Sequence, residues 1–109
     1  MAKPAPLAPP AMVALYDKLL ATHSEIERKG AKNPYTSRNG HMFSFLDKTG
    51  ALSLRLGKDE REAFLKKHKT ELSFQYNTVM KEYVLVPGPL FKKTRTMAKY
   101  LAMSWEYVG

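Results

Sequence analysis

The chain has 109 residues, 44% of them hydrophobic, and no cysteine. This length is typical of a single domain with one core, and the lack of cysteine excludes a disulfide framework, thiol catalysis and cysteine-ligated zinc. The chain has 18 Lys and Arg residues but only 10 Asp and Glu residues, which gives a net charge of +8. This charge favours phosphate backbones or acidic surfaces as partners. Without a membrane-length apolar run or a signal peptide core, we expect a cytoplasmic protein with no membrane contact.

The N-terminal part of the chain predicts an arm followed by a helix. Four of the seven prolines fall in the first ten residues, so we expect residues 1–10 to form a flexible Pro-rich arm and residues 11–109 a single domain. Apolar side chains recur at spacings of three and four between residues 12 and 26, which places them on one helical face. This spacing predicts a helix over about residues 10–29.

The next stretch predicts three antiparallel strands. Asn39 and Gly40 form a strong hairpin signal, because a type I′ turn needs positive φ at both of its central positions. This turn joins a strand at 35–38 to a second strand at about 41–46. A third strand is predicted at about 52–56, where leucines alternate with polar residues so that one face is apolar.

The C-terminal half predicts a helix, a second hairpin and a final helix. The helix covers about residues 59–69, and the hairpin strands cover about 72–76 and 81–86. A long helix follows Pro89 with a narrow apolar stripe, formed by Leu90, Thr94, Met97, Leu101, Trp105 and Val108. We therefore expect an α+β fold with the order α-β-β-β-α-β-β-α, in which Leu101 and Trp105 are buried.

Four segments followed by a C-terminal helix together resemble the TfoX/Sxy N-terminal-domain family: GHMFSFL at 40–46, LSLRL at 52–56, DEREAFL at 59–65 and MKEYVLVP at 80–87. The resemblance covers about residues 11–108. It implies a two-layer α/β sandwich with an antiparallel sheet, similar to secretion-chaperone-like and YjbR-like architectures. It also implies an association with the regulation of natural competence, and it supplies no catalytic residues to carry over.

Positive charge is most concentrated on the last predicted helix. Lys92, Arg95 and Lys99 project opposite its apolar stripe, with Lys93 beside them. A rigid helix fixes the spacing of such cations, which suits contacts to phosphates. The alternative is a solvated helix face without a partner.

Self-association is predicted from the second strand. Phe43 and Phe45 alternate there with Met42 and Leu46, so both faces of the strand carry large apolar groups. Because a two-layer fold has helices for only one face, we expect Phe43 and Phe45 on an uncovered face that pairs with a second copy. A stacking platform for bases, which would use the aromatic residues of the strands, is a weaker alternative; these residues are Tyr35, Phe43, Phe45, Phe74 and Tyr76.

No catalytic, metal or cofactor site is predicted. His23, His41 and His68 fall on separate elements without a second ligand at metal-binding spacing, and the serines lack a nucleophile-elbow context. The glycines punctuate turns and form no phosphate-binding loop. The sequence thus favours a non-enzymatic regulatory or protein-interaction module, a homodimer or a binder of another protein. A basic nucleic-acid-binding protein, acting in transcription or DNA-uptake regulation, is the alternative.

Overall fold

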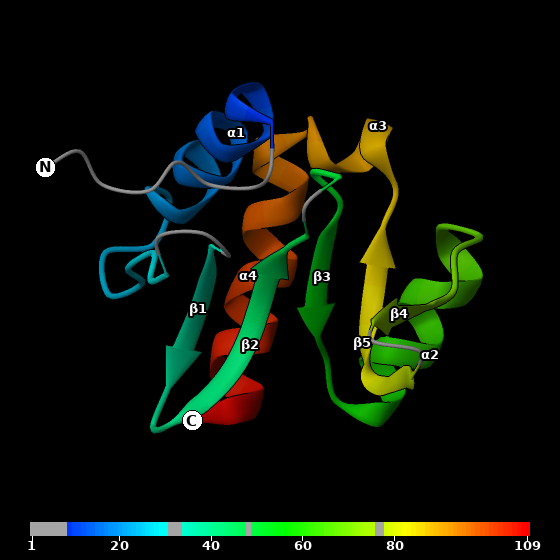
Figure 1. Cartoon of the computed structure of the whole chain (residues 1–109). Coiled ribbons are helices and arrows are strands. Elements are labelled where there is room, and N and C mark those ends of the chain that lie inside the picture. The colour runs from blue at the N-terminus through cyan, green and yellow to red at the C-terminus, as the bar shows by residue number, and fades with distance from the viewer. Residues whose placement is uncertain (1–8, 31–33, 48, 76–77) are drawn as a thin grey trace, which may run out of the picture.

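The structure is a computed structural model that describes residues 9–30, 34–47, 49–75 and 78–109. Over these residues the chain forms four helices and a five-stranded antiparallel sheet (Figure 1). This is the α+β class that the sequence predicts, in an arrangement compatible with a two-layer sandwich. Apart from its last two residues, the predicted arm at 1–10 lies outside the described part of the chain.

The elements follow the predicted order, except that the last helix is divided in two. They are α1 (Pro10–Leu20), β1 (Tyr35–Arg38), β2 (His41–Leu46), β3 (Leu52–Arg55), α2 (Lys58–Lys67), β4 (Leu72–Gln75), β5 (Thr78–Val86), α3 (Gly88–Phe91) and α4 (Thr94–Val108). The strands lie side by side in the order β1-β2-β3-β5-β4, and every neighbouring pair is antiparallel. Strands β1 and β4 are therefore the two edges of the sheet.

The core lies between one face of the sheet and the helices. The three central strands contribute aligned apolar residues to that face, and all of them are buried: Leu46, Leu52 and Val86 in one row, Leu54 and Val84 in the next. Helix α4 runs along β2 and β3 and contacts both α1 and α3 (Figure 1). Burial of this apolar surface is the main force that holds the layers together.

The turn between β1 and β2 is as predicted. Asn39 has φ 54° and Gly40 has φ 79°, the two positive values that a type I′ turn requires. Arg38 and His41 pair across it. The sequence signal and the backbone therefore agree at the start of the sheet.

Helix α1 is shorter than the prediction of residues 10–29, because it ends at Leu20. The Thr22 hydroxyl donates a 2.6 Å hydrogen bond to the carbonyl of Leu19, and such side-chain bonds to the backbone compete with helix continuation. Ile26 is nevertheless buried and the His23 ring lies 5.2 Å from the Trp105 ring. These residues reach the core through turns, so their helix-like spacing does not reflect a helix.

One polar anchor joins α1 to the sheet. The Tyr16 hydroxyl lies 2.6 Å from Ser44 Oγ, and Ser44 also bonds the hydroxyl of Thr36. All three side chains are fully buried. Burial raises the pKa of Tyr16 to about 12, because the charged phenolate would lose its hydration inside the core.

The predicted helix after Pro89 is interrupted at Lys92 and Lys93, between α3 and α4. In an unbroken helix Phe91 would project about 100° away from the apolar stripe, whereas the break lets Phe91 reach the core, where it is buried. Leu101 is buried as predicted. Trp105 is only partly buried, and Tyr100 and Ser104 occupy core positions that the stripe does not include.

The prediction that Phe43 lies on an uncovered face is wrong, because strand β2 contains a bulge at this residue. Thr36 pairs with Ser44 and Ser37 pairs with Met42, so Phe43 is an extra residue without a partner on β1. A bulge disturbs the alternation of side chains, and Phe43 and its neighbour Ser44 are both 0% exposed. Phe43 packs edge-on against Trp105 of α4, with ring centroids 5.8 Å apart. Phe43 is therefore a core residue, and it does not lie on an uncovered face.

Candidate functional site

The outer edge of β1 is closed by the chain itself. Lys29 and Tyr35 form an antiparallel bridge in which each backbone N–H donates to the other residue's carbonyl, at 2.7 and 2.9 Å. The Lys29 ammonium also donates a 2.9 Å hydrogen bond to the Ser37 hydroxyl on β1. A cation and a paired backbone are two of the ways in which proteins protect sheet edges from other strands.

The outer edge of β4 carries no such protection among the described residues. Within the described ranges, strand β4 pairs with β5 alone, and Phe74 lies directly opposite Val79. Cross-strand partners share a face of the sheet, and these two side chains are 59% and 49% exposed. The sequence of β4, Leu-Ser-Phe-Gln, contains no charge. An unpaired, uncharged edge with two adjacent exposed apolar groups is a template for pairing with another strand.

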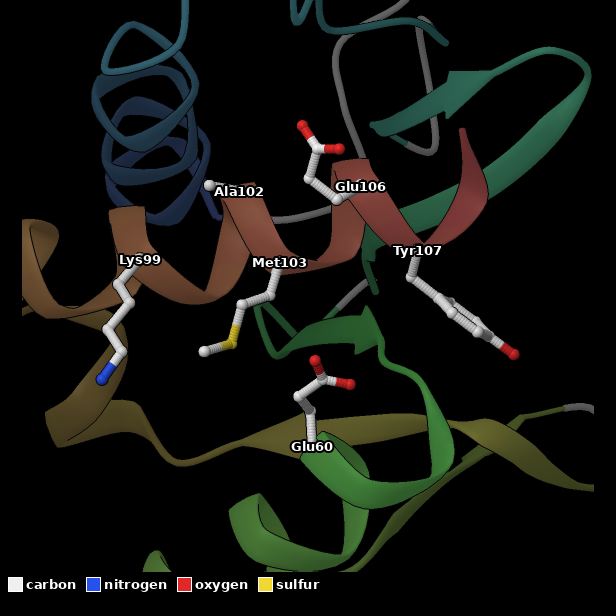
Figure 2. A pocket seen from close by; sticks show the side chains of 6 residues that line it. All are labelled: Glu60, Lys99, Ala102, Met103, Glu106 and Tyr107. Carbon is white, nitrogen blue, oxygen red and sulfur yellow. The ribbon is translucent and has the colours of Figure 1, made fainter.

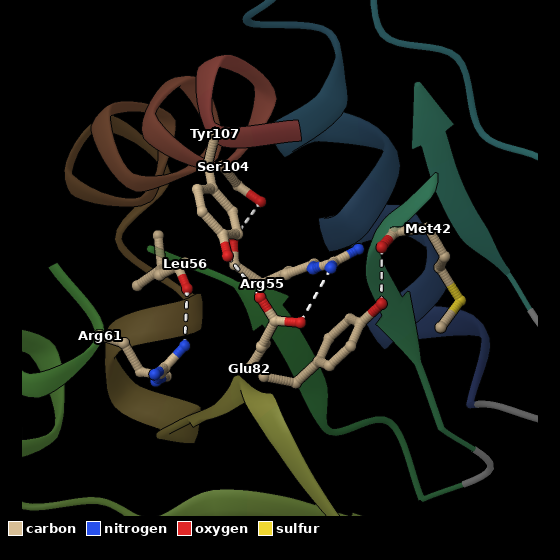
Figure 3. Close-up of polar contacts among 8 residues, drawn as sticks. Met42, Arg55, Leu56, Arg61, Glu82, Ser104 and Tyr107 are labelled. Atoms are coloured by element: carbon tan, nitrogen blue, oxygen red, sulfur yellow. Dashed lines mark hydrogen bonds and ion pairs between the residues drawn. The ribbon is translucent and has the colours of Figure 1, made fainter. Parts of the chain in front are cut away.

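The predicted self-association residue Phe45 lies elsewhere on the sheet. It is partly buried, its backbone pairs with Ser53, and its ring lies 5.6 Å from the ring of Tyr83. Tyr83 in turn donates a 2.6 Å hydrogen bond to the carbonyl of Met42 (Figure 3). On the face of the sheet opposite the core, neighbouring side chains thus cover part of the apolar surface. This face therefore has less need of a partner molecule.

A cluster of polar side chains ties α4 to β3 and β5 (Figure 3). Glu82 accepts a 2.9 Å hydrogen bond from Arg55 and a second from the hydroxyl of Tyr107. The Ser104 hydroxyl shares its one proton between the carbonyls of Phe43 and Arg55, at the place where β2 and β3 stop pairing. These contacts hold the C-terminal part of α4 against the sheet.

The protonation states in this cluster follow from its hydrogen bonds. The bond from Tyr107 lowers the pKa of the Glu82 carboxyl, and the Arg55 guanidinium lowers it further. The same bond raises the pKa of Tyr107, because ionisation would remove the donated proton. Near neutral pH the cluster contains a carboxylate, a guanidinium and a neutral phenol, a combination suited to holding structure. Neither a nucleophile nor a poised general base results.

A shallow groove of about 470 Å³ lies beside this cluster, between α2 and α4. Its lining residues are Glu60, Lys99, Ala102, Met103, Glu106 and Tyr107. Figure 2 shows Glu60 of α2 and Met103 of α4 pointing toward one another across it. Two carboxylates, one ammonium and a small apolar floor provide contacts for binding but no groups for nucleophilic catalysis.

The structure places all four predicted basic residues on the surface: Lys92, Lys93, Arg95 and Lys99 are exposed. They do not share one helix, because Lys92 follows α3 and Lys93 precedes α4. A fifth cation, Lys67 at the end of α2, lies on the same side of the molecule as Lys93. Its charge and that of Lys93 both act on the imidazole of His68. Lys67 lies in the last turn of α2, where a cation favours the helix dipole, and only the tertiary structure relates it to Lys93.

The predicted aromatic platform does not assemble on one surface. Phe43 is in the core and Phe74 is exposed on β4, while Tyr76 lies outside the described residues. Among the described residues, no group of three or more His, Cys, Asp or Glu side chains is placed to hold a metal ion. Within those same residues no helix is both long and apolar enough to cross a membrane.

The open edge at Phe74 and Val79 is the feature that sequence patterns did not reveal. Period-two alternation groups Phe74 with Leu72 as one apolar face, but a register irregularity after Leu72 breaks this relation. Strand β5 also begins at Thr78, three residues before its predicted start. Comparison with known proteins adds no further indication, since no family model, curated protein or solved structure matches the chain.

Proposed function

We propose that this protein is a non-enzymatic interaction module of the TfoX/Sxy N-terminal-domain type, which forms a homodimer through the outer edge of β4. The observation that supports this proposal most strongly is the exposure of Phe74 on the edge strand β4, beside the exposed Val79 on β5. Pairing would supply partners for the free backbone groups of β4 and would place the side chains of the added strand against Phe74, which reduces the apolar surface exposed to water.

A second copy of the chain suits this edge for two reasons. Two identical edges can pair antiparallel about a two-fold axis, so that each contact occurs twice and the assembly closes as a dimer. In addition, β4 carries no charge, so the two copies meet without like charges at the contact, although each has a net charge of +8. The two sheets would then join into one continuous sheet across the axis.

The proposal is tested by light scattering coupled to size exclusion over a wide range of concentration. The parent protein is expected to show a dimer that dissociates on dilution. The double variant Phe74→Thr/Val79→Thr is expected to be monomeric, because threonine keeps the strand preference and removes most of the apolar surface. A monomeric parent at every concentration would overturn the proposal.

Phe45→Thr serves as the comparison variant, because Phe45 is the remaining candidate for association through the sheet face. If the dimer uses the β4 edge, Phe45→Thr leaves its dissociation constant unchanged under conditions where circular dichroism shows the variant folded. If Phe45→Thr abolishes the dimer and the double variant at the edge does not, the interface is the sheet face and the β4 proposal is wrong.

A further inference from the structure

The end of α2 is fixed against α4 beside the junction of α3 and α4. His68 Nε2 lies 2.9 Å from the hydroxyl of Tyr100, and the ring of Phe64 packs edge-on against the Tyr100 ring at 4.9 Å. Phe64 and Tyr100 are buried. These contacts hold the C-terminal end of α2 against the first half of α4, although Lys67 and Lys93 are 26 positions apart in the sequence.

Cations from both helices gather around this contact. Burial lowers the pKa of His68, and the positive charges of Lys67 and Lys93 lower it further, so both ammonium groups lie close enough to act on the imidazole. The Lys99 Nζ is 5.8 Å from the centre of the Tyr100 ring. We call this surface the basic face; it consists of Lys67, Lys93 and Lys99, together with Lys92 and Arg95, which neighbour Lys93 along the chain, and all five are exposed.

Ion pairs within the described residues do not neutralise the basic face, although Glu60 and Glu106 line the same groove as Lys99. Over the described residues, none of its five cations forms an ion pair with a carboxylate, whereas Arg28 and Arg55 elsewhere do. Lys93 and Arg95 also stand at the N-terminal end of α4, whose first turn has no acidic residue. A helix N-terminus carries partial positive charge, so cations there reduce stability. Helix stability therefore does not explain these two residues.

We propose that the basic face binds the phosphate backbone of duplex nucleic acid without reading its sequence. From Lys93, which precedes α4, to Lys99 the helix advances about 9 Å at 1.5 Å per residue, over which one strand of B-DNA presents two to three phosphates, at about 3.4 Å each. Tyr100, whose ring lies below Lys99, is only 7% exposed, so unpaired bases could not stack on it. The charges and the buried ring together favour a duplex over a single strand. This proposal does not depend on the dimer.

The test is a fluorescence anisotropy titration of a labelled DNA duplex at several salt concentrations. The triple variant Lys67→Gln/Lys93→Gln/Lys99→Gln removes cations that both helices contribute. It is expected to bind at least about tenfold more weakly at low salt, and its salt slope is expected to fall by about 0.9 for each phosphate that the variant no longer neutralises. Circular dichroism and a urea midpoint equal to that of the parent show that the variant is folded.

The matched control is Lys18→Gln/Lys58→Gln/Lys81→Gln, which removes the same charge from exposed lysines outside the basic face. It is expected to retain nearly the parent affinity. If both triple variants lose affinity equally, net charge alone attracts the DNA and the proposal fails. The proposal also fails if the parent does not bind the duplex at low salt, or if poly-glutamate of equal charge competes as well as unlabelled duplex, which would indicate an acidic protein surface as the partner.

Discussion

The two edges of the sheet differ in whether their outward-facing backbone groups have hydrogen-bond partners among the described residues. On β1 the bridge between Lys29 and Tyr35 provides hydrogen-bond partners for outward-facing backbone groups, and the Lys29 side chain lies along the edge and bonds Ser37. On β4 the chain provides an uncharged strand whose Phe74 is exposed beside Val79. Because unprotected edges tend to pair with other strands, the difference indicates which side of the sheet is available to a partner. The closed edge belongs to the part of the fold that α1 and α4 cover.

The largest expected effect concerns the closed side, at Phe43. Phe43→Ala should lower the free energy of unfolding by about 3–5 kcal/mol, because it leaves a cavity against Trp105 in a fully buried site. Urea unfolding followed by tryptophan fluorescence measures this change. A loss below about 1 kcal/mol would mean that the bulge does not direct Phe43 into the core, and the contrast between the two sides would weaken.

An intermediate effect is expected at Tyr16, which anchors α1 over the same side. Tyr16→Phe removes the hydrogen bond to Ser44 and should cost about 1–2 kcal/mol at pH 8. Because the pKa of Tyr16 is raised to about 12, its contribution is fully present below pH 10, the usual tyrosine value, and is lost between pH 10 and about 12. That loss amounts to about 3 kcal/mol in the parent.

Urea unfolding of both proteins between pH 8 and pH 11 checks this expectation. The variant has no phenol at this position, so its stability should fall less steeply above pH 10 than that of the parent. The other tyrosines are common to both proteins and cancel in the comparison. Parallel pH profiles would show that Tyr16 is accessible to water, and that α1 does not seal this side of the sheet.

The smallest effect is expected on the open side. Phe74→Thr should change the stability of the monomer by less than about 0.5 kcal/mol, because the side chain is already largely in water. Urea unfolding at a concentration below the dimer's dissociation constant measures the monomer alone. A loss of more than about 1 kcal/mol would show that Phe74 contributes to the core, and the two edges would then differ less than the structure indicates.

Local sequence patterns were sufficient for the class of the fold. The type I′ turn at Asn39 and Gly40 depends only on the backbone preferences of two residues, and the strand leucines at Leu52 and Leu54 follow from period-two alternation. The stripe of the last helix correctly placed Leu101 in the core. Each of these signals acts within a few residues along the chain, so a short stretch of sequence is enough to interpret it.

The candidate sites depended on contacts between distant segments. The bulge that buries Phe43 arises from the register between β1 and β2 and from the packing of α4, and no local pattern specifies it. The exposure of Phe74 follows from the place of β4 at the end of the strand order. Lys67 and Lys93 both lie near His68 because Phe64 and His68 pack on Tyr100. Composition and periodicity determined the charge and the layers, whereas strand order, register and helix packing decided which side chains face a partner, since these arise only when the whole chain packs.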